Sequence, residues 1–293
     1  AYRLHCALRG VDIESRMLVQ TKDSINPTVI GPASDLRKAV GKIRPRLDRL
    51  PLQLYPNRDH MPFSVQYVPS RLRNMIDEFD PDVINLHWVC EGFLSIEGIG
   101  YLRRPVVWTL HDMWPFTGGC HCALGCERYV AACGACPQLA SCRTSDLSRC
   151  IWKRKRQAWR AVDLSVVAPS RWLADCAQRS SLFGDLRIET IAHGLNTRVF
   201  KPIDKSEARE ILNLSPDRYL ILAAPIGYDQ VKRPDLLLQD VNALSETWSK
   251  KIEIVTMGVS PLAMATLRLP AHHLGYLHDD ASLVLAYSAA DIA

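Results

Sequence analysis

A histidine and an aspartate directly follow an apolar run, at the position where α/β sheets carry functional residues. His111 and Asp112 directly follow the apolar, β-branched run of residues 106–110. Such a run is typical of a buried strand, and in an open α/β sheet ligands bind beyond the carboxyl ends of the strands. An imidazole and a carboxylate there can exchange a proton with a substrate or orient it. We therefore predict that His111 and Asp112 are catalytic; the alternative is an ordinary solvated strand end.

A second histidine ends the preceding apolar run. Residues 82–89 read DVINLHWV, and this run ends on His87 and Trp88. Two consecutive strands that end in histidine favour one site at one edge of a sheet. We assign His87 and Trp88 to the acceptor side of that site. The alternative is that either histidine is a core residue with satisfied hydrogen bonds.

A cysteine-rich loop follows His111 and spans residues 115–150. Cys133 and Cys136 have the C-x-x-C spacing of a zinc knuckle, and Cys120 and Cys126 are the best candidates for two further ligands. Four thiolates bind zinc tetrahedrally in structural sites, so we predict a structural zinc. Disulfides or free thiols are the alternatives, because the spacing between the four is not that of a standard finger. The remaining thiols of the loop would be free: Cys122, Cys142 and Cys150.

The elements that must position these residues alternate between strand and helix. Besides the two runs above, we expect strands over 15–20, 164–170 and 186–196, and helices over 70–79 and from 171 onward. Residues 23–62 are basic and rich in proline, and we expect a solvated, partly helical region there. This order predicts an α/β fold with a Rossmann-like domain over residues 1–198.

A second α/β unit is expected over residues 199–293. Strands over 219–227 and 251–259 flank a helix over 235–247, and the loop between carries Gly227, Lys232 and Arg233. These residue types can hold a phosphate, although the loop has neither a P-loop nor G-x-G-x-x-G. The chain ends on a helix and the first residues of a new strand.

Charge and hydropathy narrow the class of protein. The net charge of +5 permits an anionic partner such as a nucleotide diphosphate or a membrane without demanding one, and we expect no nucleic-acid partner. There is neither a bilayer-spanning apolar run nor a signal peptide, so we expect a cytoplasmic protein. Residues 149–160 predict a basic amphipathic helix with tryptophan that contacts the inner membrane peripherally. The alternative is a surface helix whose charges are solvated.

Several stretches together carry a family resemblance: NLHWV, VVWTLHDMWPFTGGCH, CERYVAACGACPQL, DLSVVAPSRWL, IETIAHGLNTRVFKP, VKRPDLLLQ and LGYLHDDASLVLAYSAADI. In these stretches the chain resembles the family 4 glycosyltransferases with the GT-B fold, and among them bacterial exopolysaccharide enzymes of the colanic-acid type. The resemblance implies two Rossmann-like domains and transfer of a sugar, with retention, from a nucleotide-sugar donor to a saccharide or lipid-linked acceptor. It also implies that no metal cofactor is required for catalysis.

The resemblance assigns roles to individual residues. Lys232 matches the family lysine that contacts the diphosphate, with Gly227, Arg233 and Asn196 also on the donor side. His111 matches the histidine near the transferred sugar. The chain departs from the pattern in three places: it has no arginine shortly before Lys232, Arg233 replaces a glycine, and the N-G-x-D loop reads HGLN.

Both ends of the chain differ from a complete domain pair. The first strand with its glycine-rich turn is not found before residue 2, and the E-x7-E donor segment would follow residue 293. We therefore expect a chain truncated at both ends and without activity by itself. A nucleotide-sugar epimerase of the same fold and a non-catalytic sugar-nucleotide or metal-binding module are the alternative functions.

Overall fold

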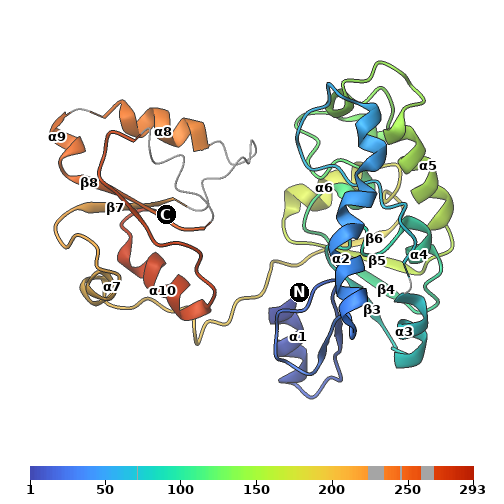
Figure 1. The fold of residues 1–293 in the computed structure, drawn as a ribbon, viewed down its shortest axis with the longest axis horizontal. Coiled ribbons are helices and arrows are strands. Elements are labelled where there is room, and N and C mark those ends of the chain that lie inside the picture. The colour runs from blue at the N-terminus through green and yellow to red at the C-terminus, as the bar shows by residue number, and fades with distance from the viewer. Residues whose placement is uncertain (71, 224–233, 245, 259–266) are drawn as a thin grey trace. The chain divides into compact units, whose positions relative to one another are not determined.

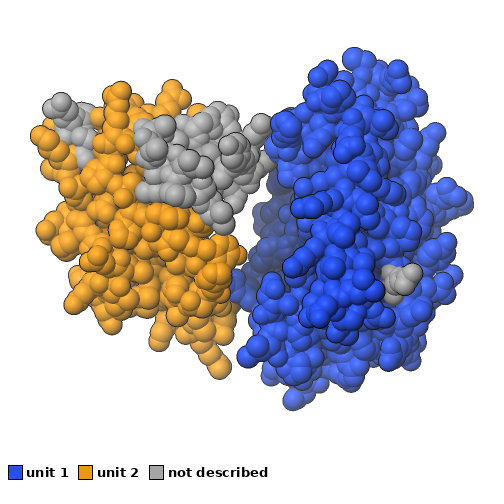
Figure 2. All heavy atoms as spheres, in the orientation of Figure 1, with its two compact units in different colours: residues 1–194 blue, residues 195–293 orange. Residues whose placement is uncertain are grey.

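The structure is a computed structural model that describes residues 1–70, 72–223, 234–244, 246–258 and 267–293. It divides into two units, residues 1–194 and 195–293, close to the predicted boundary after residue 198 (Figures 1 and 2). Both units are built from parallel strands with helices between them, as the sequence predicts for an α/β protein.

The first unit contains a four-stranded parallel sheet in the order β3-β4-β5-β6, and a separate parallel pair of strands, β1 and β2. The strands are β1 (Met17–Leu18), β2 (Val29–Ile30), β3 (Ile84–Leu86), β4 (Val106–Thr109), β5 (Leu164–Ala168) and β6 (Arg187–Thr190). The helices are α1 (Tyr2–Arg9), α2 (Asp35–Asp48), α3 (Leu72–Phe79), α4 (Ile96–Gly100), α5 (Leu147–Ala158) and α6 (Arg171–Arg179). Short 3-10 turns lie at η1 (Leu50–Leu54), η2 (Trp114–Phe116), η3 (Arg128–Val130) and η4 (Pro137–Leu139).

The register of the sheet places the predicted site residues at one edge. In the parallel pair β3 and β4, Leu86 is the partner of Trp108. The residues that follow the two strands therefore emerge on the same side of the sheet, which is the carboxyl edge where ligands bind in this fold class.

Side chains at the N-termini of three of these helices explain where the helices begin. The Ser34 side chain accepts a hydrogen bond from the Arg37 amide at the start of α2. Asp146 caps α5 and Ser170 caps α6 in the same way. Each cap satisfies an amide that has no partner within its helix.

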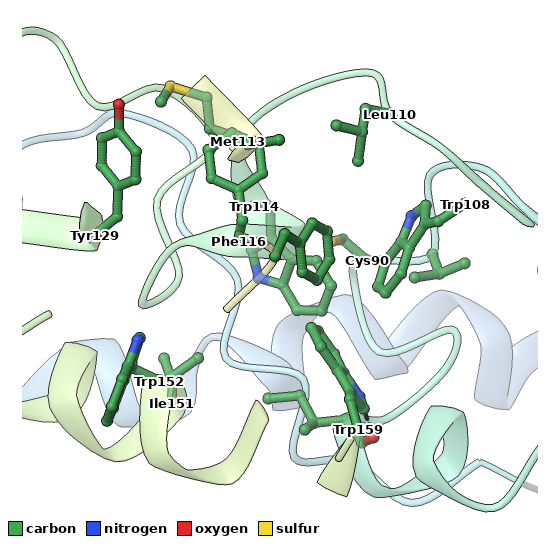
Figure 3. Packing of buried hydrophobic residues seen from close by; sticks show 14 of the residues in the cluster. Cys90, Trp108, Leu110, Met113, Trp114, Phe116, Tyr129, Ile151, Trp152 and Trp159 are labelled. Atoms are coloured by element: carbon green, nitrogen blue, oxygen red, sulfur yellow. Dashed lines mark hydrogen bonds between the residues drawn. The ribbon is translucent and has the colours of Figure 1, made fainter. Parts of the chain in front are cut away.

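A cluster of aromatic rings forms the core of the first unit (Figure 3). Trp108, Trp114 and Phe116 are almost fully buried, and the rings of Trp108 and Trp159 meet edge to face with their centroids 5.1 Å apart. Edge-to-face packing brings the positive edge of one ring to the negative face of the other. Because Trp108 lies on β4 and Trp114 in the loop after it, this core holds the loop against the sheet.

The second unit contains a three-stranded parallel sheet in the order β7-β8-β9. The elements are α7 (Lys205–Ile211), β7 (Tyr219–Ala223), α8 (Pro234–Asn242), α9 (Glu246–Ser249), β8 (Ile252–Thr256), β9 (Ala271–His273) and α10 (Asp280–Ala289). Ile292 forms a parallel bridge with Ile221, which is the new strand expected at the end of the chain. The helix predicted over 235–247 is wrong in extent, because α8 ends at Asn242.

The prediction for residues 23–62 is confirmed in its partly helical character, since the segment contains α2, a helix of 14 residues. It is wrong about the charges, which are not all solvated. Arg44 donates hydrogen bonds to the carbonyl oxygens of Gly92 at 2.6 Å and Pro69 at 2.8 Å. Among the described residues no helix combines the length and apolar character needed to cross a bilayer.

Candidate active site

Three histidines gather at the carboxyl edge of the four-stranded sheet. His87 directly follows β3, His111 follows β4, and His193 follows β6. The Nδ1 atom of His87 lies 3.0 Å from Nε2 of His111, and the rings of His111 and His193 stack with centroids 5.0 Å apart. The structure thus brings together the two histidines singled out from the sequence. His193 was missed as a site residue, although it lies in the same kind of position after a predicted strand.

The histidine pair is uncharged at neutral pH. Burial above all, and the proximity of the His111 and His193 rings, lower the pKa of His87 to about 4. Partial loss of solvent and the neighbouring His193 also lower the pKa of His111. In the contact between His87 and His111 one neutral ring donates its N–H and the other accepts. The pair can therefore accept a proton or a hydrogen bond from a bound molecule.

Asp112 is held by three hydrogen bonds. Its Oδ1 accepts the Trp114 amide at 2.8 Å, and its Oδ2 accepts the Trp88 indole N–H at 3.0 Å and the His121 ring at 2.6 Å. Burial raises the pKa of Asp112, but the hydrogen bonds, that of His121 above all, outweigh it and the pKa is lowered. This carboxylate therefore positions Trp88 and the loop after β4. Its catalytic role stays a prediction.

Ser64, His121 and Asp112 form a buried relay of hydrogen bonds. The Ser64 hydroxyl lies 2.8 Å from Nε2 of His121, and Nδ1 of the same ring faces Asp112. Because an ionised carboxylate only accepts, Nδ1 carries the hydrogen and a neutral ring accepts from Ser64 at Nε2. The order of groups is that of a serine nucleophile triad, but both Ser64 and His121 are buried. The relay therefore stabilises the loop, and sequence reasoning missed it because Ser64 is remote in the chain.

A fully buried lysine lies beneath the same loop. Lys155 on α5 donates hydrogen bonds to the carbonyl oxygens of Trp114 and Thr117, and its ammonium lies 3.6 Å from the centre of the Trp114 ring. Burial lowers the pKa of Lys155 to about 7. The sequence prediction placed this lysine among the basic residues of the helix over 149–160, facing a membrane or solvent. Its spacing of four from the core residues Ile151 and Trp159 was the available signal.

The four predicted zinc ligands line one small pocket. A cavity of about 20 Å³ is bordered by Cys120, Cys126, Cys133 and Cys136, with apolar neighbours such as Phe63. Burial raises the pKa of Cys120 to about 12 and that of Cys133 to about 11. Within the described residues no three His, Cys, Asp or Glu side chains are placed to hold a metal ion. The structure gathers the four cysteines without arranging them as ligands, so the zinc prediction is not confirmed.

The membrane contact predicted for residues 149–160 does not fit the structure. Ile151, Trp152 and Trp159, the apolar side chains expected to meet lipid, are buried in the core (Figure 3). Arg154 donates to Glu97 at 2.8 Å instead of facing solvent alone. The prediction is wrong because the apolar side of α5 faces the protein.

The predicted donor-side residues lie in or near the second unit. Gly227, Lys232 and Arg233 fall outside the described residues. Asn196 is exposed, and its side-chain oxygen accepts the Arg198 amide at 3.0 Å. Asn196 thus stabilises a turn, and its contact with a donor stays a prediction.

Comparison with known proteins identifies the family of the chain. A family model described as Glycosyltransferase Family 4 matches residues 18–199, more than half of the chain. Over 199 residues the chain is 30% identical to WcaC of Escherichia coli K12, whose name assigns it to colanic acid biosynthesis as a glycosyl transferase. The match covers 61% of this chain and 45% of WcaC, so the chain spans less than half the length of this curated relative.

Two solved structures share the fold. Sucrose-phosphate synthase from Thermosynechococcus elongatus superposes with a TM-score of 0.60 at 16% identity, over 99% of this chain and 67% of that one. WaaG, a glycosyltransferase involved in lipopolysaccharide biosynthesis, superposes with a TM-score of 0.53 at 10% identity, over 96% and 67%. At such identities the likeness concerns the fold alone, and it confirms the predicted GT-B fold class.

Proposed function

Since the chain belongs to glycosyltransferase family 4, we propose that the protein transfers a sugar, with retention, from a nucleotide-sugar donor to a saccharide or lipid-linked acceptor. The similarity to WcaC supports surface polysaccharide biosynthesis as the setting. We place the reaction on the cytoplasmic side, with the protein peripheral to the inner membrane.

The histidine cluster is the observation that supports this function. His87 and His111 lie at the carboxyl ends of adjacent parallel strands, where ligands bind in this fold class. Their lowered pKa values leave uncharged nitrogens that can hydrogen-bond sugar hydroxyl groups without carrying charge into the site. We assign His111 to the transferred sugar, and His87 with Trp88 to the acceptor side. Trp88 is half exposed, and Asp112 fixes its indole N–H.

The donor side of the proposal rests on the family resemblance. Departure of a nucleoside diphosphate builds negative charge on its phosphates, and positive groups aimed at that charge lower the barrier. Lys232 and Arg233 are the cations assigned to this task, with Gly227 and Asn196 beside the donor. We propose that these cations replace a divalent metal, so that transfer persists when EDTA removes free metal ions.

The test is transfer by a protein that contains this chain. It is incubated with a panel of nucleotide sugars and a polysaccharide-lipid acceptor, and the released nucleoside diphosphate and the product are measured. Lys232→Ala should lower turnover by about 10²–10³-fold, the usual effect of removing one such stabilising group. His111→Ala should also slow transfer, whereas His60→Ala, at an exposed histidine, should not.

Each other outcome has a distinct meaning. Unchanged kinetics for Lys232→Ala and His111→Ala would show that the site lies elsewhere. An epimerised sugar nucleotide without transfer would show an epimerase, and donor binding without turnover would show a binding module.

A further inference from the structure

The His111 ring is held at one edge and on one face. Nδ1 of His87 lies 3.0 Å from Nε2 of His111, and the His193 ring stacks on His111 with an angle of 20° between the two planes. Within the part of the chain that the structure describes, no group forms a hydrogen bond with Nδ1 of His111, and the side chain is exposed. Nδ1 is therefore the nitrogen of this ring that a bound molecule can reach.

The carboxylate next to His111 does not orient its ring. In many active sites a carboxylate accepts an N–H of the functional histidine and so fixes its orientation. Asp112 directly follows His111, but its two oxygens are occupied by the hydrogen bonds to other groups described above. Among the described residues no Asp or Glu forms a hydrogen bond with His111. The group that contacts a nitrogen of this ring is His87 instead.

His87 is suited to orient another side chain because its own backbone is fixed. It directly follows β3, and Leu86 and Val89 on either side of it are buried. Its carbonyl oxygen accepts the indole N–H of Trp108 at 3.1 Å, and Trp108 belongs to the aromatic core. A group on so rigid a support can hold a neighbouring side chain in one geometry.

The contact between the two rings also sets a tautomer. Burial above all lowers the pKa of His87 and that of His111, so both rings are neutral at neutral pH. In a neutral imidazole one nitrogen carries the hydrogen and the other accepts. If His87 donates to Nε2 of His111, then Nδ1 of His111 carries the hydrogen; if Nε2 donates, Nδ1 is a bare acceptor. The direction of one hydrogen bond thus decides what Nδ1 offers to a ligand.

We propose that His87 is a positioning residue for His111: it holds Nε2, so that Nδ1 is the atom that meets the transferred sugar. This inference rests on the proposed function, which assigns His111 to that sugar. His87 can keep its place on the acceptor side, because its own Nε2 forms no hydrogen bond within the described residues. A substitution that removes the contact should therefore impair the oriented step more than the binding of the donor.

The first test compares three substitutions at His87 in a protein that contains this chain and transfers sugar. Asparagine places an amide atom near the position of Nδ1, glutamine places one near that of Nε2, and leucine has neither. We expect kcat to fall about tenfold in His87→Leu and His87→Gln, and less than about threefold in His87→Asn, since a misplaced group slows the oriented step. The KM for the donor should change less than about twofold. His60→Leu, at an exposed histidine, is the matched control and should behave like the parent.

A second pair of variants tests which nitrogen of His111 meets the sugar. His111→Asn keeps an amide atom near the position of Nδ1, and His111→Gln keeps one near that of Nε2. If Nδ1 is the functional atom, the asparagine variant should retain at least about tenfold more activity than the glutamine variant. The reverse order would overturn the assignment.

Nitrogen-15 NMR of the histidine rings tests the pair in the 293-residue chain without any sugar. Ring nitrogens with and without a hydrogen have different shifts, so the spectrum reports the tautomer, and His111→Asn identifies the His111 signals. We expect one tautomer of His111 in the parent and in His87→Asn, and a mixture of both in His87→Leu. A mixture in the parent, or signals that His87→Leu leaves unchanged, would overturn the inference.

The two kinds of measurement distinguish a failure of this inference from a failure of the proposed function. If the parent transfers sugar but His87→Leu and His87→Asn have the same kcat, the positioning role is overturned and the function stands. If the parent transfers no sugar while the His111 tautomer still depends on His87, the function and the role at the sugar are overturned. Circular dichroism on each variant shows whether the fold is retained.

Discussion

Replacement of Asp112 by asparagine tests whether a carboxylate organises the loop after β4. In Asp112→Asn the side-chain oxygen can still accept the Trp114 amide, which faces Oδ1. The new NH₂ group then replaces Oδ2 and faces two donors, His121 and Trp88. His121 can adapt, because its other tautomer accepts at Nδ1 and donates to Ser64 at Nε2. The indole N–H of Trp88 cannot adapt and must turn to water.

The expected loss of stability follows from these contacts. A hydrogen bond to a charged group contributes about 1.5–3 kcal/mol, and a neutral one about 0.5–1.5 kcal/mol. The contacts with Trp114 and His121 lose their charge, and the contact with the half-exposed Trp88 is broken. We therefore expect the free energy of unfolding to fall by about 2 kcal/mol at pH 7. The Asp112 side chain retains 20% exposure, which keeps the estimate below the range for a fully buried pair.

The dependence on pH has a definite sign. The pKa of Asp112 in the folded chain lies below the ordinary 3.8. The carboxylate therefore stabilises the fold above pH 3.8, and that contribution is lost as the pH falls through the folded value. The difference between parent and Asp112→Asn should accordingly shrink in acid. Asp175→Asn, at an exposed aspartate of α6, is the matched control and should change stability by less than about 0.5 kcal/mol.

Urea unfolding followed by tryptophan fluorescence provides the measurement. Six of the seven tryptophans, all but Trp248, lie in the first unit, so the signal reports that unit. A loss below about 0.5 kcal/mol at pH 7 would refute an organising role for the carboxylate. A loss that does not shrink as the pH is lowered from 7 through the folded pKa of Asp112 would show that charge is not its cause.

Three further predictions follow from the buried groups. The pKa of Lys155 is about 7 in the folded chain, against an ordinary 10.5 in the unfolded chain, so the free energy of unfolding should rise between these pH values. Urea unfolding at pH 6.5 and 9.5 measures this rise, and Lys155→Met should remove it. The His87 ring should titrate at about 4 in NMR, and a midpoint near 6.5 would contradict its placement against His111. The exposed thiols of Cys6, Cys142 and Cys150 should react with iodoacetamide before the buried Cys133 and Cys136. Elemental analysis of the same sample tests for zinc. One equivalent of zinc per chain, together with pocket thiols that become reactive when EDTA is added, would support the predicted zinc site. Less than about a tenth of an equivalent would exclude it.

Local pattern accounts for the parts of the fold that the sequence predicts. Apolar runs followed by polar residues correctly indicated β3, β4 and β5, and the helical spacing of apolar residues indicated α3, α5 and α6. Both signals depend on neighbours in the chain, as does the placement of His87 and His111 after their strands. The meeting of these two histidines follows as well, because the ends of adjacent parallel strands share one edge.

The environment of the site residues was decided by contacts between distant parts of the chain. Ser64 meets His121 across 57 residues, and Lys155 meets Thr117 across 38. No local pattern reveals such partners, so the sequence indicated neither the hydrogen bonds of Asp112 nor the burial of Lys155. The structure shows that Asp112 is held by hydrogen bonds and that Lys155 is buried.

The sequence by itself determined that α2 and α5 each carry apolar and basic side chains, because both kinds of residue recur at helical spacing in the two segments. Only the tertiary structure decided which way each apolar face points. On α5, Ile151 and Trp152 fill the core, whereas on α2 Asp48 and Arg44 take the inward side through hydrogen bonds and leave Leu36 and its neighbours in solvent. The periodicity of apolar residues identifies the apolar face of a helix, but whether that face is buried depends on which other parts of the chain pack against it.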